Sequence, residues 1–301
     1  MGELVQLDMF TVSAVDPPWR DNRDAMEYPF LALQKRRTKP IVFRKNGLSL
    51  SVAADSRFSI ATVWDWDLII FAASHLNEAI EAARKPSPRV QFVPYDCLRQ
   101  IGRGTGGKDY RELAQAIRRL MATLVITNIR SQDQLESGEE SGFHWLCGFK
   151  IPKKYTRVHF TQDDPDGEPD PARPWEIELP PWLYNAILRR RDILAVHPDY
   201  FQLTGGIERW LYRLARKAVP DKAEVPAFSF RLETLHKQSG VTSQLKEFRR
   251  MVKHIAARQP LPEYGIRIDR KDRSELVTLY RDRTKPGRLP RGFRLTLIEG
   301  E

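Results

Sequence analysis

A glycine-rich stretch in the first half of the chain has the composition of a phosphate-binding loop. It reads Gly-Arg-Gly-Thr-Gly-Gly-Lys-Asp from Gly102 to Asp109, which satisfies the dinucleotide-binding pattern G-x-G-x-x-G and comes within one residue of the P-loop pattern. A P-loop needs a Ser or Thr hydroxyl for Mg²⁺ directly after Lys108, and both motifs follow a strand, whereas residues 95–101 have the pattern of a short helix. We therefore interpret the glycines as a turn between two helices, with a nucleotide site as the alternative.

Residues that could bind metal or act as nucleophiles are dispersed along the chain. There is no H-E-x-x-H motif, no His-x-His pair, no cysteine–histidine cluster and no G-x-S-x-G elbow, and a nicking endonuclease would need metal-binding histidines close together. Two cysteines, Cys97 and Cys147, are too few for a disulfide framework and fit small core residues in a reducing compartment. We therefore expect no catalysis, no cofactor and no metal. The six histidines lie at positions 75, 144, 159, 197, 236 and 254.

The distribution of charge favours a nucleic-acid ligand. The 301 residues carry a net charge of +10, which suits nucleic acid or an anionic membrane surface. Residues 181–301 hold 25 basic and 14 acidic side chains, interleaved with helix and strand patterns, so the charge belongs to a folded surface. No apolar run approaches the ~18 residues of a membrane span, and the N-terminus lacks the pattern of a secretory signal. We expect a cytoplasmic protein with no membrane contact.

Two similar blocks of predicted elements occur in the same order. The first comprises a long helix at 65–84, a strand at 90–93, a short helix at 95–101, a turn, a helix at 108–121 and a hairpin within 123–149. The second comprises a helix at 205–218, a strand at 227–230, a short helix at 231–238, a turn, a helix at 241–258 and a hairpin near 264–269 and 275–280. This is the order of a winged helix, in which the helix after the turn enters the major groove.

The blocks predict an α+β fold of two tandem winged-helix domains. Residues 161–174 contain four prolines, five acidic side chains and no large apolar residue, so they cannot bury a core. The first hairpin has an acidic tip, which phosphates would repel, so we expect it to point toward a protein partner. The expected division is an N-terminal arm at 1–40, a first winged-helix domain at 41–160, an acidic proline-rich linker or loop at 161–174, and a second winged-helix domain at 175–301 that is the main DNA-binding domain.

The helix expected at 241–258 is a candidate recognition helix. Its apolar residues are spaced three or four apart and form one stripe, which leaves a basic face opposite. We expect Lys246 and Arg250 to reach base edges, and Arg249 and Lys253 to meet phosphates; an ordinary solvated basic face is the alternative. The apolar stripe is Leu245, Phe248, Val252 and Ile255, and the candidate DNA-binding residues are Ser243, Lys246, Arg249, Arg250, Lys253 and His254.

The helix expected at 108–121 and the second hairpin supply further candidates. Gln115 lies at the centre of the outward face of the helix and suits adenine recognition. The hairpin is rich in basic residues, which suit the DNA backbone or minor groove. The candidates on the helix are Lys108, Arg111, Gln115, Arg118 and Arg119, and those on the hairpin are Arg267, Arg270, Lys271 and Arg273.

Three stretches resemble a known family, the replication initiator protein A family of alphaproteobacterial plasmids. They are Met26 to Phe30 (Met-Glu-Tyr-Pro-Phe), Gly102 to Tyr110, and Asp199 to Lys217, and the resemblance covers roughly residues 25 to 285. It implies binding to repeated sites at a plasmid origin, local opening of the duplex, recruitment of host replication proteins such as an initiator and a helicase, and often repression of the protein's own promoter. The aromatic content of Asp199 to Lys217 predicts core packing before DNA contact.

The resulting interpretation is a plasmid replication initiator whose partners are double-stranded DNA at origin repeats and host replication proteins, with a homodimer as a further candidate state. Two recognition helices in one chain can cover about two successive major grooves, ~34 Å apart, which suits direct repeats of roughly 20 base pairs. A sequence-specific transcriptional repressor without initiation activity is the alternative. An enzyme acting on nucleic acid or nucleotide, dependent on Lys108, is a third hypothesis.

Overall fold

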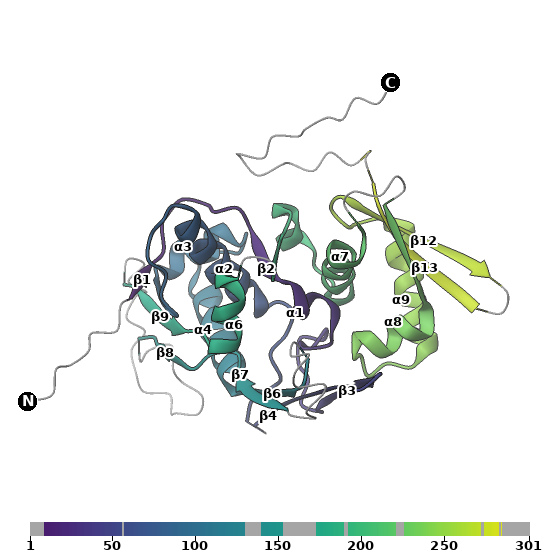
Figure 1. Ribbon diagram of the computed structural model, residues 1–301, viewed down its shortest axis with the longest axis horizontal. Helices are drawn as coiled ribbons and strands as arrows, with labels where there is room; N and C mark the ends of the chain where they lie inside the picture. Colours follow the sequence, from purple (N-terminus) through teal and green to yellow (C-terminus); the bar gives the residue numbers. More distant parts are fainter. Residues whose placement is uncertain are drawn as a thin grey trace, which may run out of the picture.

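The computed structural model contains two units built in the same way. It describes residues 9–55, 57–129, 140–152, 173–189, 192–220, 226–271, 274–282 and 284. Each unit consists of a helix, a strand, two further helices and an antiparallel hairpin whose second strand pairs with the first strand of the unit. Figure 1 shows the first unit on the left and the second on the right.

The second unit has the element order that the periodicity predicts. In its sheet the order is β11-β13-β12. The strand β11, which precedes the two helices joined by a turn, therefore pairs with β13, the second strand of the hairpin. This is the arrangement of a winged helix. The elements are α7 (Gly206–Ala218), β11 (Ala227–Arg231), α8 (Leu232–Ser239), α9 (Leu245–Arg258), β12 (Tyr264–Lys271) and β13 (Ser274–Arg281).

The first unit repeats this topology. Its sheet has the order β1-β5-β9-β8, in which β5-β9-β8 matches β11-β13-β12 and β1 is added in parallel to β5. The chain therefore folds as tandem winged helices, as predicted. The elements are β1 (Phe10–Thr11), α2 (Trp66–Glu81), β5 (Arg89–Phe92), α3 (Pro94–Gln100), α4 (Gly107–Ala122), β8 (Gly148–Lys150) and β9 (Trp175–Glu178).

The wing of the first unit is a different hairpin from the one expected. The hairpin expected within 123–149 forms as β6 (Thr123–Thr127) and β7 (Ser141–His144), but β6 pairs with β4 in a separate sheet of order β3-β4-β6-β7. The strand that pairs with β5 is β9, whose other neighbour is β8. Residues 161–174, expected as a linker or long loop, thus belong to the connection between the two strands of the wing. The two remaining strands of the separate sheet are β3 (Ile41–Lys45) and β4 (Leu48–Ala54).

The N-terminal segment is part of the folded body from Met9 onward, and it does not form a free arm. Met26 and Phe30 are fully buried in the core. β2 (Arg20–Asn22) pairs with β10 (Ile193–Ala195), and α6 (Pro181–Leu188) packs on α2, so the first unit extends through β10 and the boundary expected at 161–174 is wrong. The short helices α1 (Arg23–Glu27) and η2 (Pro198–Gln202) complete the described elements.

Buried ion pairs join α7 of the second unit to the first unit. The Asp67 carboxylate of α2, 1% exposed, accepts hydrogen bonds from Arg209 (2.7 Å) and from Arg103 (3.0 Å). Asp21 of β2 accepts from Arg213 at 2.6 Å. Since a buried charge is tolerated only when it is paired and hydrogen-bonded, these contacts fix the position of α7 relative to α2 and β2.

Close packing at the start of α7 adds to this fixation. A Cβ atom at Gly206 would collide with the carbonyl group of Leu33 and with the ring of Trp64. Tyr200 and Trp210, from the stretch expected to pack in the core, are buried, and one core cluster runs through both units. The family-like stretch Asp199 to Lys217 is therefore the main contact between the units.

We predict that Asp67→Asn lowers the free energy of unfolding by about 3–5 kcal/mol, because it leaves two guanidinium groups without their carboxylate. Arg209→Met should cost less, since Arg103 still neutralises Asp67. Urea denaturation followed by circular dichroism measures both effects. As a control, Asp55→Asn removes an exposed ion pair with Arg57 and should leave the midpoint unchanged. A wild-type midpoint for Asp67→Asn would contradict the proposed fixation.

Candidate nucleic-acid interface

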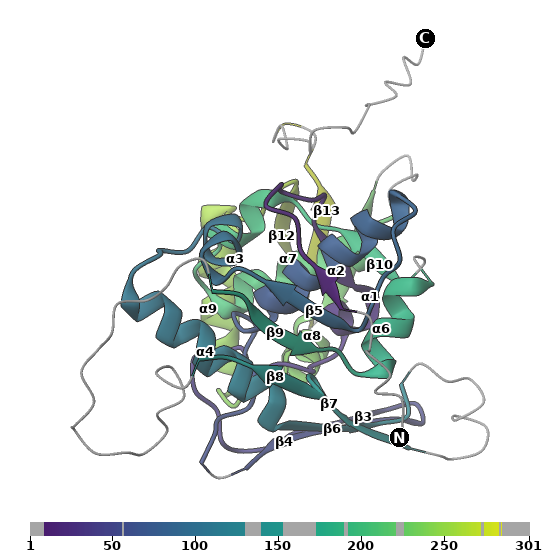
Figure 2. The same cartoon turned by 90° about the vertical axis from the view of Figure 1, so that its left-hand side faces the viewer.

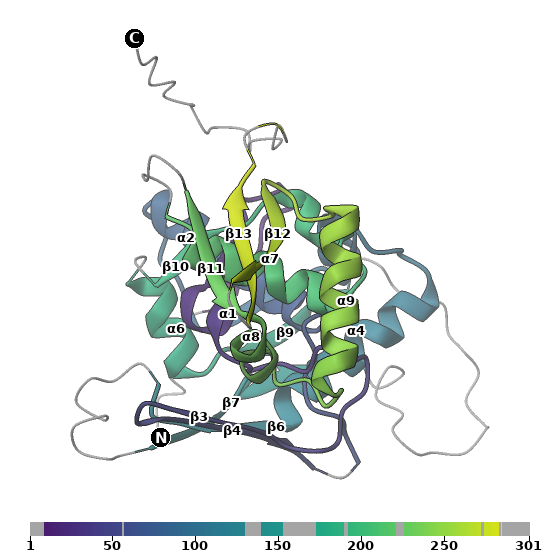
Figure 3. The same ribbon diagram turned by 90° about the vertical axis from the view of Figure 1, so that its right-hand side faces the viewer.

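The two candidate recognition helices lie on the same side of the molecule. In Figure 2 both α4 and α9 are on the left, and in Figure 3, the opposite view, both are on the right. α1 and α6 lie on the other side in both views. The fold thus presents the helix after the turn of each unit to one surface, which is the arrangement that two consecutive grooves of one duplex require.

α9 presents the basic face that its periodicity predicts. Phe248, Val252 and Ile255 are buried in the core, and Gly240, with a left-handed φ of 63°, reverses the chain between α8 and α9. Ser243 lies in this turn, where its carbonyl contacts His236 Nε2 (2.7 Å), and Gln244 is the residue at the helix N-cap. The exposed side chains of the candidate set are Lys246, Arg250, Lys253 and His254.

Glu275 of β13 pairs with two of the candidate cations. Its carboxylate accepts from Arg249 Nε at 2.6 Å and lies 2.8 Å from Lys253 Nζ. Hydrogen bonds from Lys253 and Arg249 hold the pKa of Glu275 below its ordinary value, so the group is ionised at neutral pH. The charge of this part of α9 is therefore partly neutralised in the free protein. Glu275 was not among the predicted site residues, and nothing in the sequence distinguishes it, because the same hairpin also contains Asp269 and Asp272.

The second wing is basic where the structure describes it. Arg267 is 69% exposed and pairs with Asp269 of the same strand at 2.7 Å. Arg270 is also exposed, near the end of β12. Lys271 ends the strand, and its side chain, like the whole of Arg273, lies outside the described residues. The acidic tip expected on the first hairpin also lies outside them, except for Glu140, which accepts from Ser49 Oγ at 2.7 Å.

α4 exposes only part of the face that was expected. Lys108 and Arg111 near its start are exposed and Gln115 is half-buried. Arg118, however, is 5% exposed, and burial lowers its pKa. Arg119 donates two hydrogen bonds to the buried Asp65, at 2.8 and 2.6 Å. The prediction that these two arginines face outward is wrong, because β6 and β7 pack against α4 and Asp65 lies beside its last turn.

The glycine-rich stretch is the turn between α3 and α4, as interpreted. Asp109 accepts a hydrogen bond from the backbone N–H of Gly106 at 3.1 Å and so stabilises the start of α4. Arg103 donates to Asp67 and to the carbonyl of Trp64. A helix, α3, precedes the glycines where a nucleotide-binding motif needs a strand. The stretch therefore positions α4 and binds the buried carboxylate.

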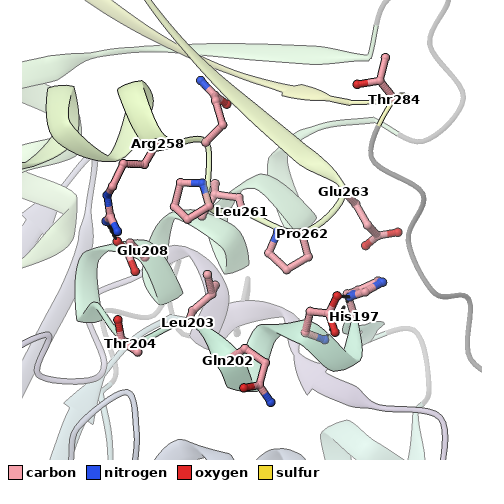
Figure 4. Close-up of a pocket in the computed structure, with 13 residues that line it drawn as sticks. His197, Gln202, Leu203, Thr204, Glu208, Arg258, Leu261, Pro262, Glu263 and Thr284 are labelled. Carbon is pink, nitrogen blue, oxygen red and sulfur yellow. Dashed lines mark hydrogen bonds and ion pairs between the residues drawn. The ribbon is translucent and has the colours of Figure 1, made fainter.

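A surface pocket of about 700 Å³ lies between η2, the start of α7 and the connection from α9 to β12. Figure 4 shows Arg258, from the last turn of α9, reaching Glu208 of α7 across one side of this pocket. His197 Nδ1 accepts from the Asp199 backbone N–H at 3.1 Å on the other side. The Arg258–Glu208 ion pair ties the end of the recognition helix to the same helix, α7, that binds Asp67 and Asp21.

Among the described residues, no group of three or more His, Cys, Asp and Glu side chains is placed to hold a metal ion. Both cysteines are free thiols: Cys97 is buried, as expected of a core residue, whereas Cys147 is exposed, so its expected place in the core is wrong. None of the described helices combines the length and the apolar character that crossing a membrane would need.

Comparison with known proteins identifies the family. The family model described as "Replication initiator protein A" matches residues 20–266. The chain belongs to this family. A protein named "Putative replication protein" from Wigglesworthia glossinidia brevipalpis is 29% identical over 254 residues, which cover 83% of this chain and 85% of the relative. The resemblance inferred from the three stretches is thereby confirmed.

Solved structures show the same fold at low sequence identity. Domains 2 and 3 of RctB, as the selenomethionine derivative, align with a TM-score of 0.57 and 13% identity, covering 89% of this chain and 99% of that one. A second RctB structure, residues 155–483, gives a TM-score of 0.51 and 12% identity over 84% of this chain and 94% of its own. The whole two-unit arrangement, and not a single winged helix, is therefore shared.

We predict that Glu275→Gln increases the affinity for specific and random duplex DNA by up to about fivefold, because partly exposed ion pairs of this kind contribute up to ~1 kcal/mol. The change frees Arg249 and Lys253 and removes a negative charge that would repel phosphates. Fluorescence anisotropy at several salt concentrations measures the effect. The matched control, Glu78→Gln on α2, breaks an ion pair with Arg84 and should leave affinity unchanged. Unchanged or weaker binding by Glu275→Gln would refute the neutralising role.

Proposed function

We propose that this protein initiates replication of a plasmid by binding repeated sequences at its origin, opening the duplex locally and recruiting host replication proteins. The observation that carries the proposal is the position of α4 and α9 on one side of a single body, in a chain of the replication initiator family. Because the buried pairs at Asp67 and Asp21 hold the units together, one chain would read two successive major grooves.

In this proposal the second unit supplies most of the affinity. Lys246 and Arg250, exposed on α9, would reach base edges, while Lys253 and the basic second wing would meet phosphates. On α4 the accessible candidates are Lys108, Arg111 and Gln115; Arg118 and Arg119 are committed to internal contacts. Both recognition helices would thus use the outward face of their first three turns.

The first wing is suited to a different ligand. Residues 161–174, within its connection, contain five acidic residues and one basic residue, and phosphates would repel such a segment. We propose that this wing contacts a protein of the host replication machinery. The basic wing of the second unit would then bind DNA, and the acidic wing of the first unit would bind a partner protein. A second copy of the chain remains a further proposed partner.

Repression of the protein's own promoter would use the same DNA-binding surface, and a repressor without initiation activity is the alternative function. Gene deletion distinguishes the two. An initiator is required for plasmid maintenance, whereas loss of a repressor raises transcription and leaves maintenance intact. We propose no catalytic role for any residue. Lys108, whose side chain is 80% exposed and lies 3.8 Å from Glu112, would contact DNA.

We predict that Arg250→Ala lowers the affinity for the origin repeat about 5- to 150-fold while random DNA is little affected, because an arginine that binds guanine contributes ~1–3 kcal/mol of discrimination. Lys253→Ala should weaken specific and random DNA by similar factors and reduce the salt slope by ~1. Titrations of both variants on both duplexes check this. Equal losses on the two duplexes for both variants would contradict the assignment of base and phosphate contacts on α9.

A further inference from the structure

A basic segment connects the two recognition helices across the junction of the units. We call Gln34–Pro40 the junction segment. Gln34 Nε2 donates to Thr242 Oγ1 at 3.2 Å, in the turn that precedes α9. The Ile60 backbone N–H donates to the carbonyl of Arg37 at 2.8 Å, and the adjacent Ala61 N–H donates to Thr123 Oγ1, at the C-cap of α4. The junction segment thus lies between the end of α4 and the start of α9.

The junction segment lies in a part of the chain whose charged residues are all basic. Residues 28–54 contain six basic side chains and no acidic one. Lys35, Arg36 and Lys39 of the junction segment are exposed, and within the described part of the chain they form no ion pair. The basic surface continues into a groove of about 670 Å³ between β3 and α8, whose lining includes Arg44 and Lys45 from the first unit and Lys237 from the second. Cations from both units therefore form one surface.

Arg37, the fourth cation of the junction segment, holds the backbone of the segment in place. Its guanidinium donates to the carbonyl of Gly240, at the end of α8, and to the carbonyls of Lys39 (2.9 Å) and Pro40 (3.0 Å). The segment is thereby tied to both units at once. The neighbouring Lys35, Arg36 and Lys39 are displayed from an ordered backbone, so fixing them against a ligand costs less conformational entropy than ordering a free tail.

We propose that Lys35, Arg36 and Lys39 bind the phosphate backbone of duplex DNA in the stretch between the two major grooves that α4 and α9 occupy. The proposal rests on the function proposed above. Two helices in successive major grooves leave one minor groove and its flanking phosphates between them, and the junction segment occupies the corresponding place in the protein. This contact carries no base recognition of its own, so it adds affinity and fixes the spacing of the two half-sites.

Duplex DNA fits these cations better than an acidic peptide does. The three side chains belong to a segment that runs from the end of α4 to the turn before α9. A peptide would need apolar anchor positions, and the exposed residues of the segment, Lys35, Arg36, Thr38, Lys39 and Pro40, include no large apolar side chain.

The test uses the full-length protein carrying Lys35→Ala, Arg36→Ala and Lys39→Ala together. On a random duplex the salt slope should fall by about 2 to 3, and affinity at physiological salt should fall on the order of 10- to 100-fold. The preference for the origin repeat over random DNA should not change. A matched variant with Arg23→Ala, Lys85→Ala and Arg189→Ala removes three exposed cations on the side of α1 and α6 and should reproduce the wild-type slope.

Ethylation interference then locates the contact. Ethylated phosphates between the half-sites should weaken binding of the wild type and not of the triple variant. A wild-type slope in the triple variant overturns the inference, and so does a protein that binds DNA normally but no longer supports replication, which would assign the segment to a protein partner. Failure of the wild type to prefer origin repeats would instead refute the proposed function, because the slope on random DNA does not depend on that preference.

Discussion

The carboxylate of Asp67 is buried at the contact between the two units, where it pairs with the guanidinium groups of Arg209 and Arg103. In a site that is 1% exposed, this charge is stable only while it is paired and hydrogen-bonded. The pair with Arg209 binds α7, and therefore the second unit, to α2. The pair with Arg103 binds the turn that precedes α4 to α2. Through Arg258 and Glu208 the same helix α7 also holds the end of α9. One buried acid thus connects both recognition helices, and the geometry of the DNA-binding surface depends on it.

The sequence predicts local elements well and pairings poorly. Residues Phe248, Val252 and Ile255 repeat at helical spacing, and the helix they predict differs from α9 only in its first turn. The wing of the first unit was misassigned because β6 and β7 are neighbours in sequence and look like an ordinary hairpin. The pairing of β6 with β4 is a contact across some seventy residues, which periodicity along the chain does not indicate. Conversely, the acidic, proline-rich composition of 161–174 predicts a linker between domains, whereas the strands that precede and follow it, β8 and β9, pair with each other.

The candidate site was predictable where a helix face is free and unpredictable where another element covers it. A helical projection places Arg118 and Arg119 on the polar face of α4, but it contains no information about the extra sheet or about Asp65. Glu275 and Arg37 act through partners in distant parts of the chain, so their roles also follow only from the fold. The resemblance to the family drew attention to a segment whose role residue spacing does not show. Its longest motif, Asp199 to Lys217, forms the interface between the units.

The claim that one rigid chain reads two successive major grooves is tested most directly by hydroxyl-radical footprinting of the full-length protein on the DNA that flanks its gene. The structure predicts, for each bound chain, two protected patches on one face of the duplex, about one helical turn apart (~34 Å). These pairs of patches should recur at each direct repeat. Protection of a single groove by each chain, or of patches on opposite faces of the duplex, would contradict the shared surface formed by α4 and α9.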